Sequence, residues 1–200
     1  MELLNPASGG AVLDIAEDLH ENDVDKALFG LFFDEDSHLS EPLYKKYGYL
    51  STQYDNYNDV LNPDLLDKIP NNRVKNCGYT HRRMKDYPGG VVVNKDGGLA
   101  PAWALKGFDG KMYPQNTLCP ICAKNAMENE IPKILNEYPY YKGRFIDVFG
   151  GGMCECFSKE HPLTREDSIK VKNEAFEALE KMGLIPGTED GFDRIIDHLA

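Results

Sequence analysis

Four short apolar runs, each reaching an acidic residue, recur along the chain. They are residues 26–33, 49–55, 144–148 and 183–189. Continuous apolar runs of this length are typical of strands that are buried on both faces of a parallel sheet. The acids at or directly after their ends are Asp34, Asp55, Asp147 and Glu189. The pattern therefore predicts four parallel strands that each deliver a carboxylate to the carboxyl end of the sheet.

Amphipathic helical patterns lie between these runs. They cover residues 10–22, 40–48, 119–138 and 163–182, and the apolar positions Ile195, Ile196 and Leu199 indicate a further helix at the C-terminal end. Thr164 and Asp167 resemble a capping box, and Pro132 is expected to kink or divide the third helix. The alternation of strands and helices predicts an α/β fold.

The fold class that fits best is a (β/α)8 barrel of parallel strands that is incomplete. Eight βα units typically need about 250 residues, whereas the sequence has 200 residues and four clear strands. We expect residues 1–200 to form one barrel-type catalytic region, truncated relative to a whole barrel. Residues 58–115 are rich in proline and glycine and are expected to form an irregular insertion, with a short strand pair that turns at residues 96–98.

Catalytic carboxylates in such folds lie at the carboxyl ends of the strands. Asp147 and Glu189 are 42 residues apart, which suits neighbouring strands joined by one loop and one helix. Two adjacent carboxyls are what glycoside hydrolysis requires, one as nucleophile or base and the other as proton donor. Acids at strand ends also cap helices or begin loops, so spacing alone indicates a site and leaves its reaction open.

The stretches "FIDVFGG", "ECFSKEHPLTRED" and "EALEKMGLIPGTEDGFD" add a family resemblance. They resemble the catalytic segment of the endo-α-N-acetylgalactosaminidase-like (β/α)8 glycoside hydrolases and their uncharacterised relatives. The resemblance is best over residues 118–193 and thinner over residues 47–59. It implies a retaining glycosidase, an enzyme acting on O-glycosyl bonds, with Asp147 as the nucleophile and Glu189 as the general acid/base.

Five further residues are candidate substrate contacts. Each has an ordinary structural alternative: the acids can cap helices, the histidine can pack in a loop, the arginine can face solvent and the tryptophan can lie in a core. They are Asp34, Asp55, Trp103, His161 and Arg165.

The cysteines support a competing interpretation. Cys119 and Cys122 form a CxxC pair, while Cys154 and Cys156 form a CxC pair. Four thiolates can hold a structural zinc ion, so the alternative function is a non-catalytic α/β binding module with zinc on these four residues. Buried free thiols or a redox pair remain open as well. The leading interpretation requires no cofactor and assigns no metal ligand.

Charge narrows the classes of partner. The formal net charge is −11 and the sequence pI is near 4.9, and the lysines and arginines are scattered. Such a protein does not attract phosphates, so we expect a carbohydrate substrate and neither nucleic acid nor an anionic membrane surface. The sequence shows no signal peptide and no transmembrane segment, and it leaves compartment and oligomeric state undetermined.

Overall fold

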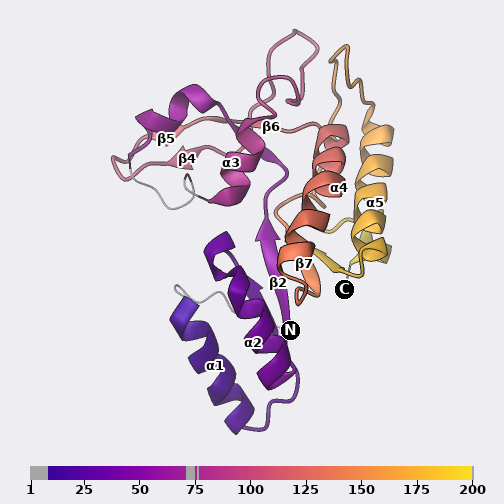
Figure 1. Ribbon diagram of the computed structural model, residues 1–200. Coiled ribbons are helices and arrows are strands. Elements are labelled where there is room, and N and C mark those ends of the chain that lie inside the picture. The colour runs from indigo at the N-terminus through magenta and orange to yellow at the C-terminus, as the bar shows by residue number, and fades with distance from the viewer. Residues whose placement is uncertain (1–8, 71–74, 76, 200) are drawn as a thin grey trace.

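The computed structural model describes residues 9–70, 75 and 77–199. A four-stranded parallel sheet in the order β1-β2-β7-β8 runs through the molecule (Figure 1). The helices and strands are, in chain order, α1 (Gly9–Glu21), β1 (Leu28–Leu31), η1 (Asp34–Leu39), α2 (Ser40–Tyr47), β2 (Leu50–Asp55), β3 (Asp59–Leu61), η2 (Pro63–Lys68), α3 (Gly78–Met84), β4 (Leu105–Lys106), β5 (Met112–Tyr113), β6 (Gln115–Thr117), α4 (Pro120–Glu137), β7 (Gly143–Ile146), α5 (Arg165–Lys181), β8 (Ile185–Thr188) and η4 (Ile196–His198). The four predicted strands and their parallel order along the chain are confirmed.

Local differences from the predicted elements have physical causes. Helix α4 continues through Pro132 as one helix of 18 residues, so the predicted division is wrong. Ile131 beside it is fully buried, and this packing outweighs the backbone hydrogen bond that proline cannot donate. The helix expected at the C-terminal end is only the 3₁₀ turn η4. The capping box at the start of α5 is confirmed, since Thr164 and Asp167 bond each other's side chain and backbone.

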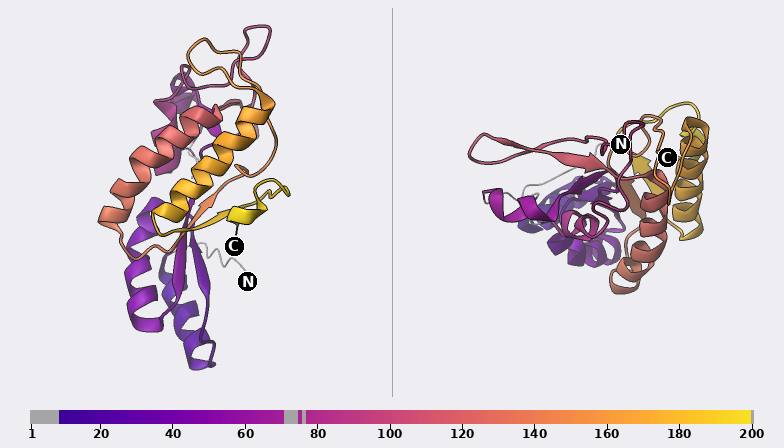
Figure 2. Two further views of the ribbon diagram at one scale, coloured as in Figure 1. Left: turned by 90° about the vertical axis from the view of Figure 1, so that its right-hand side faces the viewer. Right: turned by 90° about the horizontal axis from the view of Figure 1, so that it is seen from above.

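Helices α1, α2, α4 and α5 cover one face of the sheet. Figures 1 and 2 show α4 and α5 lying side by side, while α1 and α2 cover the β1 side of the sheet. Ile146 of β7 is buried with Phe176 and Leu179 of α5 in the larger core cluster. Phe29 of β1 and Leu43 of α2 belong to a second cluster. On the other face, which carries Tyr54 and Phe145, Tyr79 of α3 packs against Tyr54.

The register of the sheet aligns the strand ends. Asp55 of β2 pairs with Ile146 of β7, and Ile146 pairs with Thr188 of β8. The residues one step further on, Asn56, Asp147 and Glu189, therefore follow three neighbouring strands at one level. Side chains alternate between faces along a strand, so these three continue the face of Tyr54 and Phe145.

The segment between β2 and α4 lies beyond the carboxyl end of β2 (Figure 1). It contains two small antiparallel ladders, β3 with β6 and β4 with β5. The predicted strand pair that turns at residues 96–98 is present as one isolated bridge, which joins Val93 to Leu99. This segment therefore has more regular structure than its composition indicates.

A buried ion pair joins β2 to β7. Arg144 donates hydrogen bonds to Asp55 and Gln53, and Arg144 and Asp55 are each 1% exposed. Arg82 of α3 adds a contact of 3.4 Å to the other oxygen of Asp55. Burial opposes ionisation of Asp55, but the charges of Arg144, Arg82 and Arg83 outweigh it and hold the pKa of this carboxyl below its usual range. The pair fixes the two central strands against each other.

We predict that Asp55→Asn destabilises the fold by about 3–5 kcal/mol, because it leaves Arg144 buried without its counter-charge. The pKa of Asp55 is lower folded than unfolded, so its stabilisation is present above the unfolded value of about 3.9. It is lost as pH falls through the lower folded value. Urea unfolding of the complete protein against pH measures this. Glu41→Gln, which breaks the exposed pair with Lys45, is the matched control, and an equal loss in both variants contradicts the prediction.

Candidate active site

Asp147 and Glu189 lie together at the carboxyl end of the sheet. Asp147 directly follows β7, its amide donates to the carbonyl of Asp55 at 2.9 Å, and Glu189 directly follows β8. Burial raises the pKa of Glu189, and the charge of Asp147 with a side-chain hydrogen bond to it raises this pKa further. Burial and the neighbouring charge of Asp147 thus both disfavour the ionised form of Glu189.

The glycine loop behind Asp147 makes this approach possible. A Cβ atom on Gly150 would lie 1.8 Å from the backbone oxygen of Asp190, and one on Gly151 would lie 2.7 Å from its carboxylate. Only a residue without a side chain lets the loop after β7 pass so close to the end of β8. Val148 has a φ of 41°, a left-handed conformation that is a rare and strained one for a β-branched residue. The backbone is thus distorted at the residue after Asp147.

Two neighbours, Tyr54 in β2 and Asn56 directly after it, contact the carboxylate of Asp147. The side-chain amide of Asn56 donates to Asp147 Oδ2 at 3.1 Å and to Asp59 Oδ2 at 2.8 Å. Burial raises the pKa of the Tyr54 phenol, and a hydrogen bond to Asp147 raises it further. Tyr54 therefore remains a neutral hydrogen-bond donor beside Asp147.

Asp147 borders a cavity of about 210 Å³. Its other walls come from β1, β2, α3 and the insertion, and are Phe32, Tyr54, Asn56, Asp59, Tyr79, Thr80, Trp103, Leu105 and Gln115. Aromatic rings with a few convergent polar groups are the composition that small-molecule sites usually have. The cavity has the volume for one small polar ligand against Asp147.

Trp103 is held at this cavity through its backbone. Its amide donates to Asp59, and its carbonyl accepts from the side chain of Gln115 at 2.9 Å. The indole is 78% exposed. Backbone anchoring with a free ring presents an aromatic surface to whatever enters the cavity.

The structure separates the other predicted contacts from this cavity. Asp34 binds Arg82 at 2.7 Å, and Asp55 is occupied by Arg144. Side chains alternate between the two faces of a strand. Asp55 therefore faces the helices, and the next residue, Asn56, lines the cavity. Arg165 lines a different cavity with Met153 and Phe192, and His161 contacts Cys156. Of the five candidate substrate contacts, Trp103 alone borders this cavity.

Sequence reasoning missed Asn56 and Asp59. Both lie directly after the β2 run, and the signal was the string of polar residues that continues past Asp55. Choosing between Asp55 and Asn56 requires the strand register, because adjacent residues face opposite sides of a sheet.

The four-cysteine zinc set is not assembled in the structure. Cys154 Sγ lies 3.7 Å from the hydroxyl of Ser168, while Cys119 and Cys156 gather around His161. All five cysteines are free thiols.

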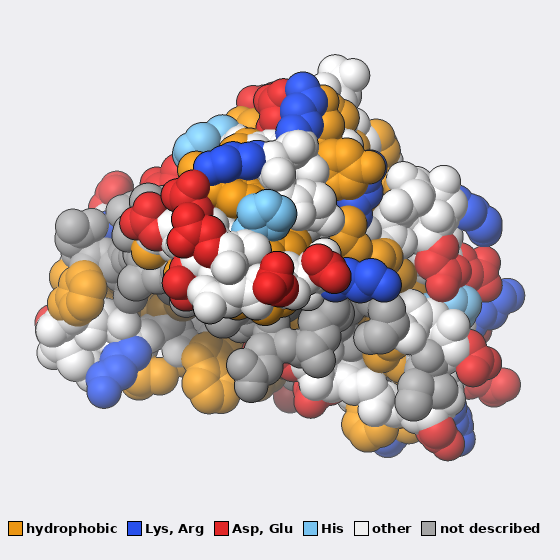
Figure 3. Space-filling model, turned by 90° about the horizontal axis from the view of Figure 1, so that it is seen from below, with side chains coloured by type: hydrophobic (Ala, Val, Ile, Leu, Met, Phe, Trp, Pro, Cys, Tyr) orange, Lys and Arg blue, Asp and Glu red, His pale blue; other side chains and the backbone are white. Residues whose placement is uncertain are grey.

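The surface agrees with the acidic composition. Figure 3 shows one face on which acidic side chains form several groups while lysines and arginines are dispersed. No helix within the described ranges is both long and apolar enough to cross a membrane.

Comparison with known proteins assigns the family. Residues 18–200 match the family described as glycosyl hydrolases related to the GH101 family, GH129. The chain belongs to family GH129. This family assignment agrees with the resemblance that the sequence motifs indicate. No curated protein matches the sequence.

Solved structures confirm the barrel type of this GH129 chain. α-N-Acetylgalactosaminidase NagBb from Bifidobacterium bifidum, in complex with GalNAc, matches with a TM-score of 0.76 at 17% identity, covering 98% of this chain and 32% of that one. The GH31 dextranase FjDex31A from Flavobacterium johnsoniae matches at 0.59 and 9% identity, covering 96% and 25%. The chain thus spans about a third of the length of NagBb, and its sheet is that of part of a TIM-barrel glycoside hydrolase.

The contact between the two carboxyls makes a direct prediction about Glu189. Asp147→Asn removes a negative charge and a hydrogen-bond acceptor, so we expect the pKa of Glu189 to fall towards its ordinary value. Carbon-13 NMR titration of labelled glutamate in the complete protein measures it. The matched control is Asp190→Asn, whose charge acts more weakly on Glu189; an unchanged pKa in Asp147→Asn refutes the contact.

Proposed function

We propose that this GH129 chain carries the catalytic pair of a retaining glycosidase that hydrolyses O-glycosidic bonds. Asp147 is the nucleophile and Glu189 is the general acid/base. The observation that carries the proposal is the interaction of the two carboxyls at neighbouring strand ends, where Asn56 donates a hydrogen bond to Asp147 and the pKa of Glu189 is raised.

In the first step Glu189 gives its proton to the glycosidic oxygen as the bond to the anomeric carbon breaks. An Asp147 carboxylate oxygen forms a new bond to that carbon, and the leaving group departs as an alcohol. The product is a covalent glycosyl-enzyme, with Glu189 now ionised. Asn56 and Tyr54 orient Asp147 for this attack.

In the second step Glu189 takes a proton from water while the water oxygen bonds to the anomeric carbon. The bond to Asp147 breaks, which restores its carboxylate and the protonated Glu189. Two displacements at one carbon retain its configuration.

The placement of the pair on neighbouring strands suits this course. Retaining enzymes hold the two carboxyls about 5–5.5 Å apart, whereas inverting enzymes separate them by about 6.5–9.5 Å to admit a water molecule. Asp147 and Glu189 follow residues that pair across β7 and β8, and the proposal requires the shorter, retaining distance between their carboxyls when a sugar is bound.

The substrate class follows from two supports. NagBb is an α-N-acetylgalactosaminidase whose structure was solved with GalNAc, and the cavity combines an exposed indole with carboxylate and amide groups. We propose an α-linked N-acetylhexosamine, with GalNAc as the first to test. Its ring would stack on Trp103, and its hydroxyls would bond to Asp59 and Asn56.

We predict that Asp147→Asn and Glu189→Gln each abolish turnover of an aryl α-GalNAc glycoside by the complete protein, with losses on the order of 10³-fold or more. Because Glu189 acts protonated, kcat/KM of the wild type falls as pH rises through its pKa, and this limb disappears in Glu189→Gln. Asp34→Asn, at a strand end outside the cavity, retains turnover. Normal turnover in either of the first two variants removes that residue from the mechanism.

Trp103→Ala is predicted to raise KM about tenfold, since burying the indole face against a sugar is worth roughly 1.5 kcal/mol. Phe108→Ala is the matched control, because Phe108 is 79% exposed on the same insertion and borders no part of the cavity. Steady-state kinetics on the aryl glycoside compares the two, and an equal KM in both argues against stacking.

A further inference from the structure

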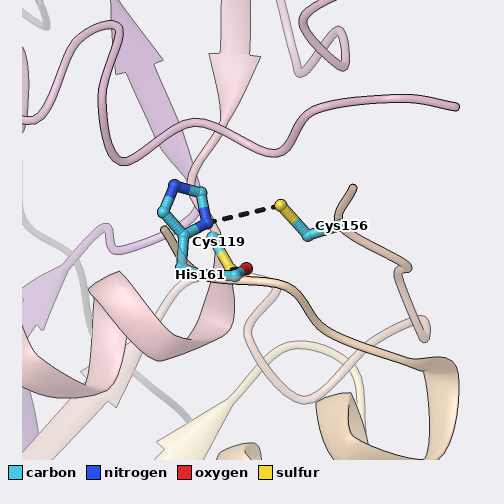
Figure 4. A group of neighbouring side chains, drawn as sticks. All are labelled: Cys119, Cys156 and His161. Carbon is cyan, nitrogen blue, oxygen red and sulfur yellow. Dashed lines mark hydrogen bonds between the residues drawn. The ribbon is translucent and has the colours of Figure 1, made fainter. Parts of the chain in front are cut away.

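A cluster of sulfur and nitrogen ligands lies outside the proposed active site. Cys119, Cys156 and His161 are all buried, and one ligand atom from each lies within 4.8 Å of the others (Figure 4). Cys156 Sγ is 3.3 Å from His161 Nδ1. Zinc–sulfur bonds of about 2.3 Å and zinc–nitrogen bonds of about 2.0–2.1 Å at tetrahedral angles place ligand atoms roughly 3.5–3.8 Å apart. The three groups therefore surround a position of the right size for zinc.

The chain supplies a fourth ligand. Cys119 directly precedes α4, and Cys122 lies within its first turn, so the two thiols form a CxxC pair and are hydrogen-bonded to each other. Cys122 is half-buried. A rotation of its side chain towards Cys156 completes a Cys3His set, which is a common composition for structural zinc sites.

Hydrogen bonds around the cluster prepare these groups to bind a metal. His161 Nε2 lies 2.7 Å from the carbonyl oxygen of Gly89, and a carbonyl can only accept. In a neutral imidazole Nε2 must then carry the proton, so Nδ1 presents its lone pair towards the cysteines.

Backbone amides point at the sulfur atoms. Val93 N–H donates to Cys156 Sγ at 3.4 Å, a second backbone amide at Ser158 donates to the same sulfur, and that of Ile121 donates to Cys119. A backbone amide that donates to a sulfur atom is the kind of contact that orients ligands around a metal. The N-terminal end of α4 adds a favourable dipole for negative charge.

From this geometry we infer that Cys119, Cys122, Cys156 and His161 form a structural zinc site. Four protein ligands leave no open coordination position, so the ion serves the fold and takes no part in the chemistry. It links the start of α4 to the loop between β7 and α5, and the contacts of Gly89 and Val93 add the insertion. These are the segments that follow Asp147 and that carry Trp103.

Zinc content tests the inference independently of glycosidase activity. The complete protein, purified without chelator, added metal or histidine tag, is analysed by inductively coupled plasma mass spectrometry. We expect Cys119→Ser, Cys122→Ser, Cys156→Ser and His161→Ala each to lose one zinc per chain relative to the wild type. Cys154→Ser, which changes a neighbouring thiol that contacts Ser168, keeps it. Wild-type protein without zinc, or the same loss in Cys154→Ser, overturns the site.

A second measurement needs no variant to fold. Zinc X-ray absorption of the wild type should give three sulfur neighbours at about 2.3 Å and one nitrogen at about 2.0–2.1 Å. Four sulfur neighbours, or a Cys119–Cys122 disulfide found by mass spectrometry after alkylation, overturn the ligand set. Zinc absent with glycoside turnover intact would reject this inference alone and leave the proposed function standing.

Discussion

The parallel pairing of β7 with β8 is the constraint on which the rest of the site depends. Side chains opposite one another in parallel strands point the same way, so Asp147 and Glu189, one step past the pair of Ile146 and Thr188, share a face. The pairing brings the carboxyls together only because Gly150 lets the loop pass against Asp190. The apolar run that ends on an acid and then on glycines thus combines a buried strand, a reactive carboxylate and the space that a second carboxylate requires.

The parts of this arrangement that follow local rules could be predicted from sequence. Continuous apolar runs gave the four strands, the pair Thr164 and Asp167 gave the start of α5, and the 42-residue spacing indicated neighbouring strand ends for the carboxylates. What sequence could not provide is which face each residue occupies. Asp55 was expected beside the substrate, but it lies one residue before Asn56 and so faces Arg144 on the helix side. Its burial there reflects a pairing between β2 and β7 that no local pattern encodes.

The loops required long-range contacts that no spacing rule supplies. His161 was expected near the cleft because of the segment that contains it, yet Gly89 from the insertion fixes its ring against Cys156. Cys154 was grouped with Cys156 by proximity in sequence, but side chains two residues apart in an irregular loop need not share a partner. Trp103 reaches the cavity because Asp59 and Gln115 bind its backbone, and both partners come from the small β3–β6 ladder. The cleft is thus built from strand ends on one side and from an anchored insertion on the other.

The proposed mechanism makes Asp147 the nucleophile that forms the covalent glycosyl-enzyme. Its most direct test is to find which residue carries the sugar. The complete protein is treated with an activated 5-fluoro α-glycoside of GalNAc, which slows the second step of a retaining enzyme, then digested and mapped by mass spectrometry. If Asp147 is the nucleophile, the sugar is found attached to Asp147, on the peptide that contains "FIDVFGG". An adduct on a different carboxylate, or hydrolysis of the unfluorinated glycoside with inversion at the anomeric carbon, would contradict it.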